Sequence, residues 1–177
     1  MDRRGFLLGL ALVPVAAGVT AQEAERFVFT SIDGGELDLA SFRGGPVLVV
    51  NTASFCGHTP QYNALQDLWE RYQSRGLTVV GVPSQSFGQE LDSAGAVKDF
   101  CEVNFGINFP MTELVEVAGP DAHPFFVWAQ AEGAAPRWNF HKILLDGDGR
   151  IAGSFGSTVE PDAPELVAAI EKLLPHA

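Results

Sequence analysis

The chain has 177 residues, of which 46% are hydrophobic and 19% are charged. This length and composition predict one globular domain with a core of its own, and they exclude a disordered tail or a mini-protein that needs disulfide staples. The formal net charge of -11 argues against nucleic acids and anionic membranes as partners.

The first residues read as an export signal that is separate from this domain. Arg3 and Arg4 precede an apolar run that ends at Ala21, the order of a charged region, a short apolar region and a small-residue cleavage site. The paired arginines resemble a twin-arginine signal. We expect residues 1–21 to be a cleavable signal peptide, residues 22–177 to be a single domain, and the mature protein to be exported, to a periplasm. The alternative is a retained membrane anchor, although the run is shorter than the roughly 20 residues that a span needs.

The first half of the domain predicts a hairpin followed by a βαβ unit. Alternating apolar residues around a Gly-rich turn predict a β-hairpin over 27–39. The continuous apolar runs 47–52 and 77–82 are typical of buried strands. Between them a helix is expected to be capped by Thr59 and to stop at Gly76. Because one helix connects the two strands, they should be parallel.

The second half predicts three helices and another hairpin. Helices are expected over 93–104, 123–131 and 163–174, from their apolar spacing. Two short apolar runs flank Asp-Gly-Asp-Gly, which predicts a hairpin over 143–155 that is antiparallel at the far side of the sheet. The complete order predicts an α/β protein with a mixed central sheet, helices on both faces and an N-terminal β-hairpin. This plan resembles the thioredoxin-like fold.

Cys56 is one of only two cysteines, and its position favours chemistry over structure. It lies between a buried strand and a helix N-terminus, where unpaired N–H groups and the helix dipole favour negative charge. A thiolate is the nucleophilic form of cysteine. An inert buried cysteine, or one half of a structural disulfide in an exported protein, is the alternative.

Four segments resemble the glutathione peroxidase family in order and spacing, and together they span essentially the whole mature chain. They are 51–62 (NTASFCGHTPQY), 81–90 (GVPSQSFGQE), 100–111 (FCEVNFGINFPM) and 138–142 (WNFHK). The resemblance implies a thiol peroxidase in which Cys56 attacks a hydroperoxide and becomes a sulfenic acid.

The resemblance also implies the rest of the catalytic site. Trp138 and Asn139 match two residues that surround the reactive sulfur in the family, where they donate hydrogen bonds. A third family position holds glutamine, and counting without gaps from Pro83 places Ser86 there. Gln85 stands one place earlier, and Gln89 is a weaker candidate. Loss of one donor to a developing charge costs on the order of 10²-fold in rate, so turnover is expected to be low.

Cys101 aligns with the resolving cysteine of thioredoxin-dependent family members. It would attack the sulfenic acid of Cys56 and form a disulfide, after the helical segment around it unwinds. The connection 121–137 is shorter than in tetrameric members that use glutathione, which implies a monomer, and no basic cluster is evident for the glutathione carboxylates. A thioredoxin-like protein is therefore favoured over glutathione as the reductant.

No cofactor is implied, and the histidines lack ligand spacing, so no metal is expected. His58 is close to Cys56 in the sequence, but an exposed loop histidine is favoured over an ion pair. Three other functions stay open: a peroxide sensor of the same fold with weak turnover, which the serine at position 86 favours, an inert domain with a static disulfide, and a thiol–disulfide oxidoreductase. The last is disfavoured because such enzymes usually carry a Cys-x-x-Cys pair.

Overall fold

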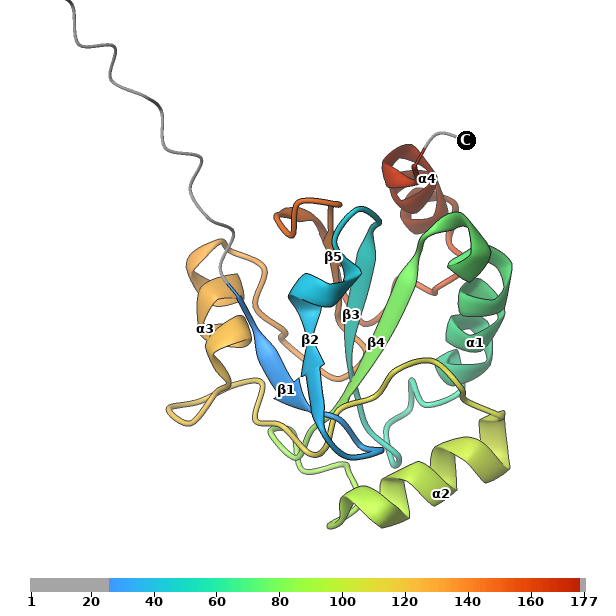
Figure 1. Ribbon diagram of the computed structural model, residues 1–177. Coiled ribbons are helices and arrows are strands. Elements are labelled where there is room, and N and C mark those ends of the chain that lie inside the picture. The colour runs from blue at the N-terminus through green and yellow to red at the C-terminus, as the bar shows by residue number, and fades with distance from the viewer. Residues whose placement is uncertain (1–25, 176–177) are drawn as a thin grey trace, which may run out of the picture.

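The computed structural model describes residues 26–175 and shows a mixed sheet between two helical layers (Figure 1). The predicted leader over 1–21 lies outside these residues. In chain order the elements are β1 Val28–Thr30, β2 Glu36–Asp38, η1 Leu39–Phe42, β3 Val47–Thr52, α1 Gln61–Tyr72, η2 Gln73–Arg75, β4 Thr78–Pro83, α2 Ala94–Phe105, α3 Pro124–Ala131, β5 Lys142–Leu145, β6 Ile151–Phe155 and α4 Pro164–Leu173. None of the helices between residues 26 and 175 has the length and apolar character that crossing a membrane requires.

The central sheet has the strand order β4-β3-β5-β6, and β1 and β2 form a separate antiparallel pair. β3 pairs in parallel with β4 and antiparallel with β5, while β5 and β6 form an antiparallel hairpin. These pairings confirm the predicted βαβ unit, the mixed sheet and both hairpins. All six residues of β3 are buried, as expected for a strand with neighbours on both edges and helices above and below.

Alternation along β3 divides the interior into two cores. Leu48 and Val50 face a core that α1, α2 and α4 cover. Val47 and Val49 face the opposite core, which α3 and the β1–β2 hairpin cover. Because side chains alternate between the two faces of a strand, one continuous apolar run supplies both cores. The layers are confirmed as predicted, with helices on both faces (Figure 1).

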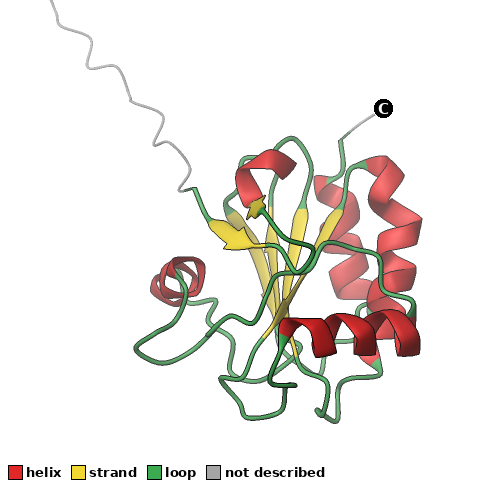
Figure 2. Cartoon of the chain, turned by 60° about the horizontal axis from the view of Figure 1, so that its bottom comes forward, coloured by secondary structure: helices red, strands yellow, loops and turns green. Residues whose placement is uncertain are grey.

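The helices lie close to their predicted bounds, and glycine ends two of the helical segments. α2 begins after Ser93, whose Oγ accepts the N–H of Ala96 at 3.3 Å. Gly106 ends α2 and Gly76 ends η2, both with φ in the left-handed region that glycine adopts without strain. α2 lies across the end of the sheet where β3 and β4 stop (Figures 1 and 2). The Cys56 loop leaves β3 at this same end.

Candidate active site

Cys56 lies in the tight loop that joins β3 to α1. Its side chain is buried and its thiol is free of a disulfide. The backbone N–H of His58 donates toward the sulfur at 3.4 Å, an arrangement that favours negative charge on the sulfur. The first N–H groups of α1 are taken by turn carbonyls, as Gln61 donates to His58 and Tyr62 donates to Thr59. The hydrogen bond to the Cys56 sulfur is therefore donated by the backbone of the loop and not by a free N–H group at the N-terminus of α1.

The predicted helix cap at Thr59 is wrong, because its hydroxyl has another partner. Thr59 Oγ1 accepts the N–H of Cys56 at 3.1 Å and lies 2.9 Å from the carbonyl of Ala53. α1 instead follows Pro60, with no side-chain cap. The hydroxyl that would have capped the helix closes the loop around the reactive cysteine. The His58 imidazole is half-buried, and its Nδ1 lies 3.5 Å from the Gln61 amide nitrogen, so this ring contacts α1.

Trp138 and Asn139 stand in a strained turn before β5, and Asn51 at the end of β3 holds this turn. Asn51 Nδ2 donates to the carbonyl of Trp138 at 3.1 Å, and its Oδ1 accepts the N–H of His141 at 3.1 Å. Phe140 has a φ of 61°, which is unusual for a residue other than glycine and marks local strain. Its buried ring meets Tyr62 edge to face, with centroids 5.3 Å apart. In this turn Trp138 is half-exposed and Asn139 is buried.

Among the three residues considered for the family's glutamine position, the structure places only Gln89 against the other site residues. Asn139 Nδ2 donates to Gln89 Oε1 at 3.0 Å, and the N–H of Phe55 donates to the Gln89 carbonyl at 2.9 Å. Gln89 thereby joins Asn139 to the Cys56 loop. Trp138 stacks at a tilt on Phe87 of the same segment, with ring centroids 5.3 Å apart.

Ser86 and Gln85 make their hydrogen bonds elsewhere. Ser86 Oγ lies 2.5 Å from a carboxylate oxygen of Glu116 and accepts the N–H of Val117 at 2.9 Å. The Gln85 amide bonds the backbone of Glu90 and reaches Asp92 at 3.3 Å. Both side chains fix the shape of the loop that presents Gln89.

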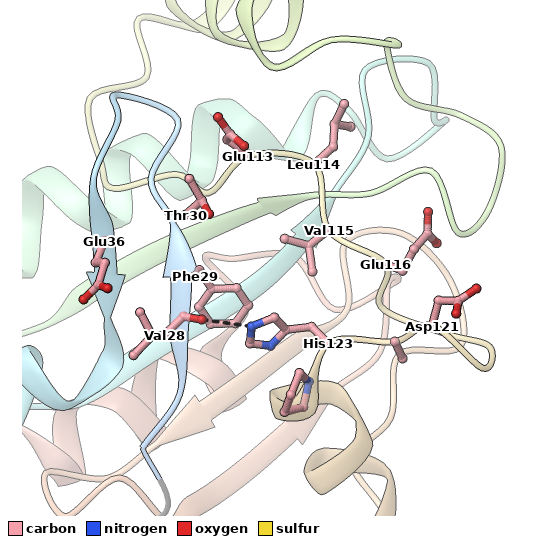
Figure 3. Close-up of a pocket in the computed structure, with 12 residues that line it drawn as sticks. Val28, Phe29, Thr30, Glu36, Glu113, Leu114, Val115, Glu116, Asp121 and His123 are labelled. Carbon is pink, nitrogen blue, oxygen red and sulfur yellow. Dashed lines mark hydrogen bonds between the residues drawn. The ribbon is translucent and has the colours of Figure 1, made fainter.

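A cavity of about 530 Å³ lies beyond this loop, between β1 and residues 113–124 (Figure 3). Four carboxylates line it: Glu36, Glu113, Glu116 and Asp121. His123 forms part of its wall, stacks on Phe29 with centroids 4.0 Å apart, and has Nε2 3.0 Å from the Val28 carbonyl. None of Cys56, Trp138 or Asn139 lines this cavity, so it is distinct from the site around the thiol. Over residues 26–175, no three metal-ligating side chains are grouped to hold an ion.

Cys101 lies in α2 and belongs to the same core as Cys56. Its thiol is free and its side chain is almost fully buried. Burial raises the pKa of Cys101 to about 11, and the carboxylates of Glu90 and Glu102 add to this rise, whereas the Tyr62 hydroxyl opposes it. At neutral pH the Cys101 side chain is therefore a thiol and not a thiolate, which is the nucleophilic form.

His141 makes the stability of this region sensitive to acid. Burial lowers the pKa of His141 from 6.5 to about 4, and the nearby cations Lys142 and Arg137 add to the shift. Its Nε2 lies 2.8 Å from Ser154 Oγ. Between these two pKa values the unfolded chain binds more protons than the native protein, so the free energy of unfolding falls as the pH drops through this window.

We therefore expect acidification from pH 7.5 to 4.5 to cost the native protein about 2 to 3 kcal/mol more than it costs a His141→Gln variant. Denaturant unfolding of both proteins at the two pH values measures the difference. Other titrating groups contribute equally to both proteins and cancel. Equal losses of stability in the two proteins would show that His141 is not held neutral.

Comparison with known proteins identifies the family of the chain. The family model described as glutathione peroxidase matches residues 25–130. The chain belongs to the glutathione peroxidase family. A hydroperoxy fatty acid reductase of Synechocystis is 44% identical over 160 residues, which cover 84% of this chain and 94% of that protein. A glutathione peroxidase homologue of Bacillus subtilis, BsaA, is 40% identical, with 81% of this chain and 93% of that protein covered.

Solved structures confirm the fold. The crystal structure of Trgpx in its apo form is 31% identical, with a TM-score of 0.64, and the match covers 84% of this chain and 96% of that one. The thioredoxin domain of a thiol-disulfide oxidoreductase from Bacteroides vulgatus, only 17% identical, shares the fold with a TM-score of 0.59 over 86% of this chain and 95% of that one. The predicted thioredoxin-like fold is thus confirmed, and as a glutathione peroxidase family member the chain is a thiol peroxidase.

Sequence reasoning missed Asn51, and it named Gln89 only as a weaker candidate. Asn51 went unnoticed as a functional residue because it closes an apolar strand, yet a polar side chain at that position was itself the signal. Gln89 was ranked below Ser86 because counting without gaps ignores how a loop turns. The site residues therefore come from four segments: β3, the Cys56 loop, the loop after β4 and the turn before β5.

Proposed function

We propose that the protein reduces hydroperoxides through Cys56, resolves the product with Cys101, and is recycled by a thioredoxin-like dithiol protein. The observation that carries this proposal is the pairing of a loop cysteine, with an N–H donor 3.4 Å from its sulfur, and a second free cysteine in the same core. Membership of the glutathione peroxidase family supports the peroxidase activity, and the second free thiol supports recycling through a disulfide.

The proposed chemistry takes three steps. The Cys56 thiolate attacks the terminal oxygen of the hydroperoxide, the O–O bond breaks, and the other oxygen leaves as water or an alcohol after it takes a proton. Cys56 is then a sulfenic acid. Attack by Cys101 forms the disulfide and releases water, and a dithiol protein reduces this disulfide by exchange.

Trp138, Asn139 and Gln89 are proposed to bind the sulfur and the peroxide oxygen. The Trp138 indole carries an N–H donor, and both amides carry donors and acceptors. The Asn139–Gln89 hydrogen bond fixes how the two amides are oriented. Hydrogen-bond donors that are already in place stabilise the charge that develops on oxygen as the O–O bond breaks.

We propose that apolar organic hydroperoxides are good substrates. Phe55, next to the reactive cysteine, is 64% exposed, and Trp138 is 42% exposed. Phe87 stacks on Trp138, and we propose that these three aromatic side chains form a rim beside the thiol. Such a rim can hold the chain of a substrate while the peroxide group reaches the sulfur. One relative in Synechocystis is named a hydroperoxy fatty acid reductase.

We propose that α2 must unwind before Cys101 can react. Cys101 is held in a helix with a cap at each end and is 1% exposed, while Cys56 lies in a separate loop. A dithiol protein suits this cycle because it reduces a disulfide directly, and one relative in Chlamydomonas is named a glutathione peroxidase-like peroxiredoxin.

A monomer that acts after export, in a periplasm, is proposed from the short 121–137 connection and the arginine-led apolar run.

The two-cysteine cycle is tested by treating the reduced protein with one equivalent of peroxide. Digestion and mass spectrometry are expected to show a bridge between Cys56 and Cys101. The Cys101→Ser variant should instead stop at a Cys56 sulfenic acid and complete one turnover without sustained consumption of a dithiol reductant. A native protein that keeps Cys101 free while Cys56 remains a sulfenic or sulfinic acid would contradict the cycle and favour a sensor.

A further inference from the structure

Several buried polar atoms near the Cys56 loop have no hydrogen-bond partner. Over residues 26–175 five such side-chain atoms occur, and four belong to Thr52, Ser54, Tyr62 and Glu90. These residues lie at the end of β3, in the Cys56 loop, in α1 and in the loop after β4. Native proteins satisfy nearly all buried polar groups, so unpaired ones at an active site call for a functional explanation.

Glu90 is the ionisable member of this group, and its position is fixed. It is 5% exposed, and its Oε1 accepts the N–H groups of Ser54 at 3.1 Å and Leu91 at 2.8 Å. The carboxyl group is therefore held against the backbone of Ser54, which stands two residues before Cys56. Its second oxygen, Oε2, is buried and unpartnered. Burial raises the pKa of Glu90, while hydrogen bonds from Ser54 and Leu91 oppose the rise.

Glu90 lies beside the core that contains Cys101 and Tyr62, because the next residue, Leu91, packs against that core. Burial is the main cause of the raised pKa of each group, and Glu90 adds to it in both. The Tyr62 hydroxyl lies near the Cys101 thiol without a well-formed hydrogen bond. A thiol with a pKa of about 11 does not attack a sulfenic acid at neutral pH unless a base takes its proton.

We propose that Glu90 takes the proton of Cys101 in the resolving step and returns it, through the Ser54 hydroxyl, to the hydroxide that leaves Cys56. This inference rests on the two-cysteine cycle proposed above. The Cys101 sulfur attacks the Cys56 sulfur, the S–S bond forms and the S–O bond breaks. Cys101 is oxidised, the sulfenic sulfur is reduced, the proton and hydroxide leave as water, and Glu90 is regenerated. As α2 unwinds, Glu90 remains beside the Cys56 loop, where Cys101 arrives.

The Glu90→Gln variant tests this role because glutamine keeps an acceptor for the two N–H groups but removes the base. Rapid mixing with one equivalent of peroxide, followed by quenching with an alkylating reagent and mass spectrometry, measures sulfenic acid and disulfide formation separately. We expect Cys56 oxidation to stay within about threefold of the native rate and disulfide formation to slow by about 10²-fold. The Glu90→Asp variant, which keeps a carboxylate, should recover at least about tenfold of this loss.

Glu102→Gln is the matched control, because Glu102 also raises the pKa of Cys101 but is exposed on α2. If both glutamates act only through their charge, both glutamine variants should lower the pKa of Cys101 and speed disulfide formation. Opposite effects, with slowing only in Glu90→Gln, support the proposal. Unchanged or faster disulfide formation in Glu90→Gln, or no recovery in Glu90→Asp, overturns it while leaving the cycle intact. A native protein that forms no disulfide overturns the cycle itself.

Discussion

Replacing Cys56 with serine is expected to lower the rate of peroxide reduction by at least about 10³-fold, because a serine hydroxyl stays protonated at neutral pH and is a poor nucleophile. The substitution changes little else. The N–H of His58, now 3.4 Å from the sulfur, can donate to the serine oxygen, and Thr59 still closes the loop. The variant should therefore unfold at nearly the same denaturant concentration as the native protein.

The measurement is peroxide consumption by reduced protein under single-turnover conditions. Cys101→Ser is the matched control, since it removes the other buried thiol and is expected to leave the first step intact. A Cys56→Ser variant that reduces peroxide within tenfold of the native rate would remove Cys56 from the mechanism. A Cys101→Ser variant that loses the first step to the same extent would show that this step is not specific to Cys56.

Replacing Gln89 with alanine is expected to slow the oxidation of Cys56 by about 10²-fold, the lower end of the range seen when one preorganised donor is lost. Gln89 accepts the hydrogen bond of Asn139, and its backbone carbonyl accepts the N–H of Phe55. Alanine keeps the second contact and removes the first. Asn139 then loses the partner that orients its buried amide.

Ser86→Ala is the control for this prediction, because Ser86 bonds Glu116 and Val117 on the far side of the same loop. We expect it to change the rate of Cys56 oxidation by less than about threefold while lowering stability by about 1 kcal/mol through the lost hydrogen bonds. Stopped-flow tryptophan fluorescence, to which Trp138 contributes, follows both variants. A large rate loss in Ser86→Ala with a native-like Gln89→Ala would restore Ser86 as the residue at the family's glutamine position.

The order and kind of the elements were predictable because the local signals agree with the global fold. The apolar run of β3 is buried on both faces, the apolar spacing after Ser93 forms α2, and Gly76 ends the helical segment that continues α1. Each of these signals rests on backbone physics that a few neighbouring residues determine. The place of Cys56 between β3 and α1 was predictable for the same reason, since a strand followed directly by a helix fixes where the intervening loop must lie.

The finer geometry of the site depends on contacts between distant segments. The hydroxyl of Thr59 could have capped the helix or bonded the loop, and in the folded protein it accepts the N–H of Cys56. The choice among Gln85, Ser86 and Gln89 depends on which side chain faces Asn139 across a gap of 50 residues. Strain at Phe140 is likewise set by tertiary packing.

Lys142 shows how far burial can depart from a sequence expectation. Lysine is almost never fully buried unless it is paired, yet Lys142 has no exposed surface. Its ammonium donates to Gln61 Oε1 at 2.5 Å and to the Val159 carbonyl at 2.6 Å. Burial lowers the pKa of Lys142 to about 8. Only the assembled contacts among β5, α1 and the segment before α4 make this burial possible.

Steady-state peroxide reduction by the reduced protein, with a thioredoxin system and with glutathione as alternative electron donors, tests the central claim most directly. The proposed cycle predicts sustained turnover that requires both Cys56 and Cys101 and runs faster with the dithiol protein. Turnover that persists without Cys56, or a single oxidation that neither donor reverses, would contradict the assignment of Cys56 as the peroxide-reducing residue of a cycling enzyme.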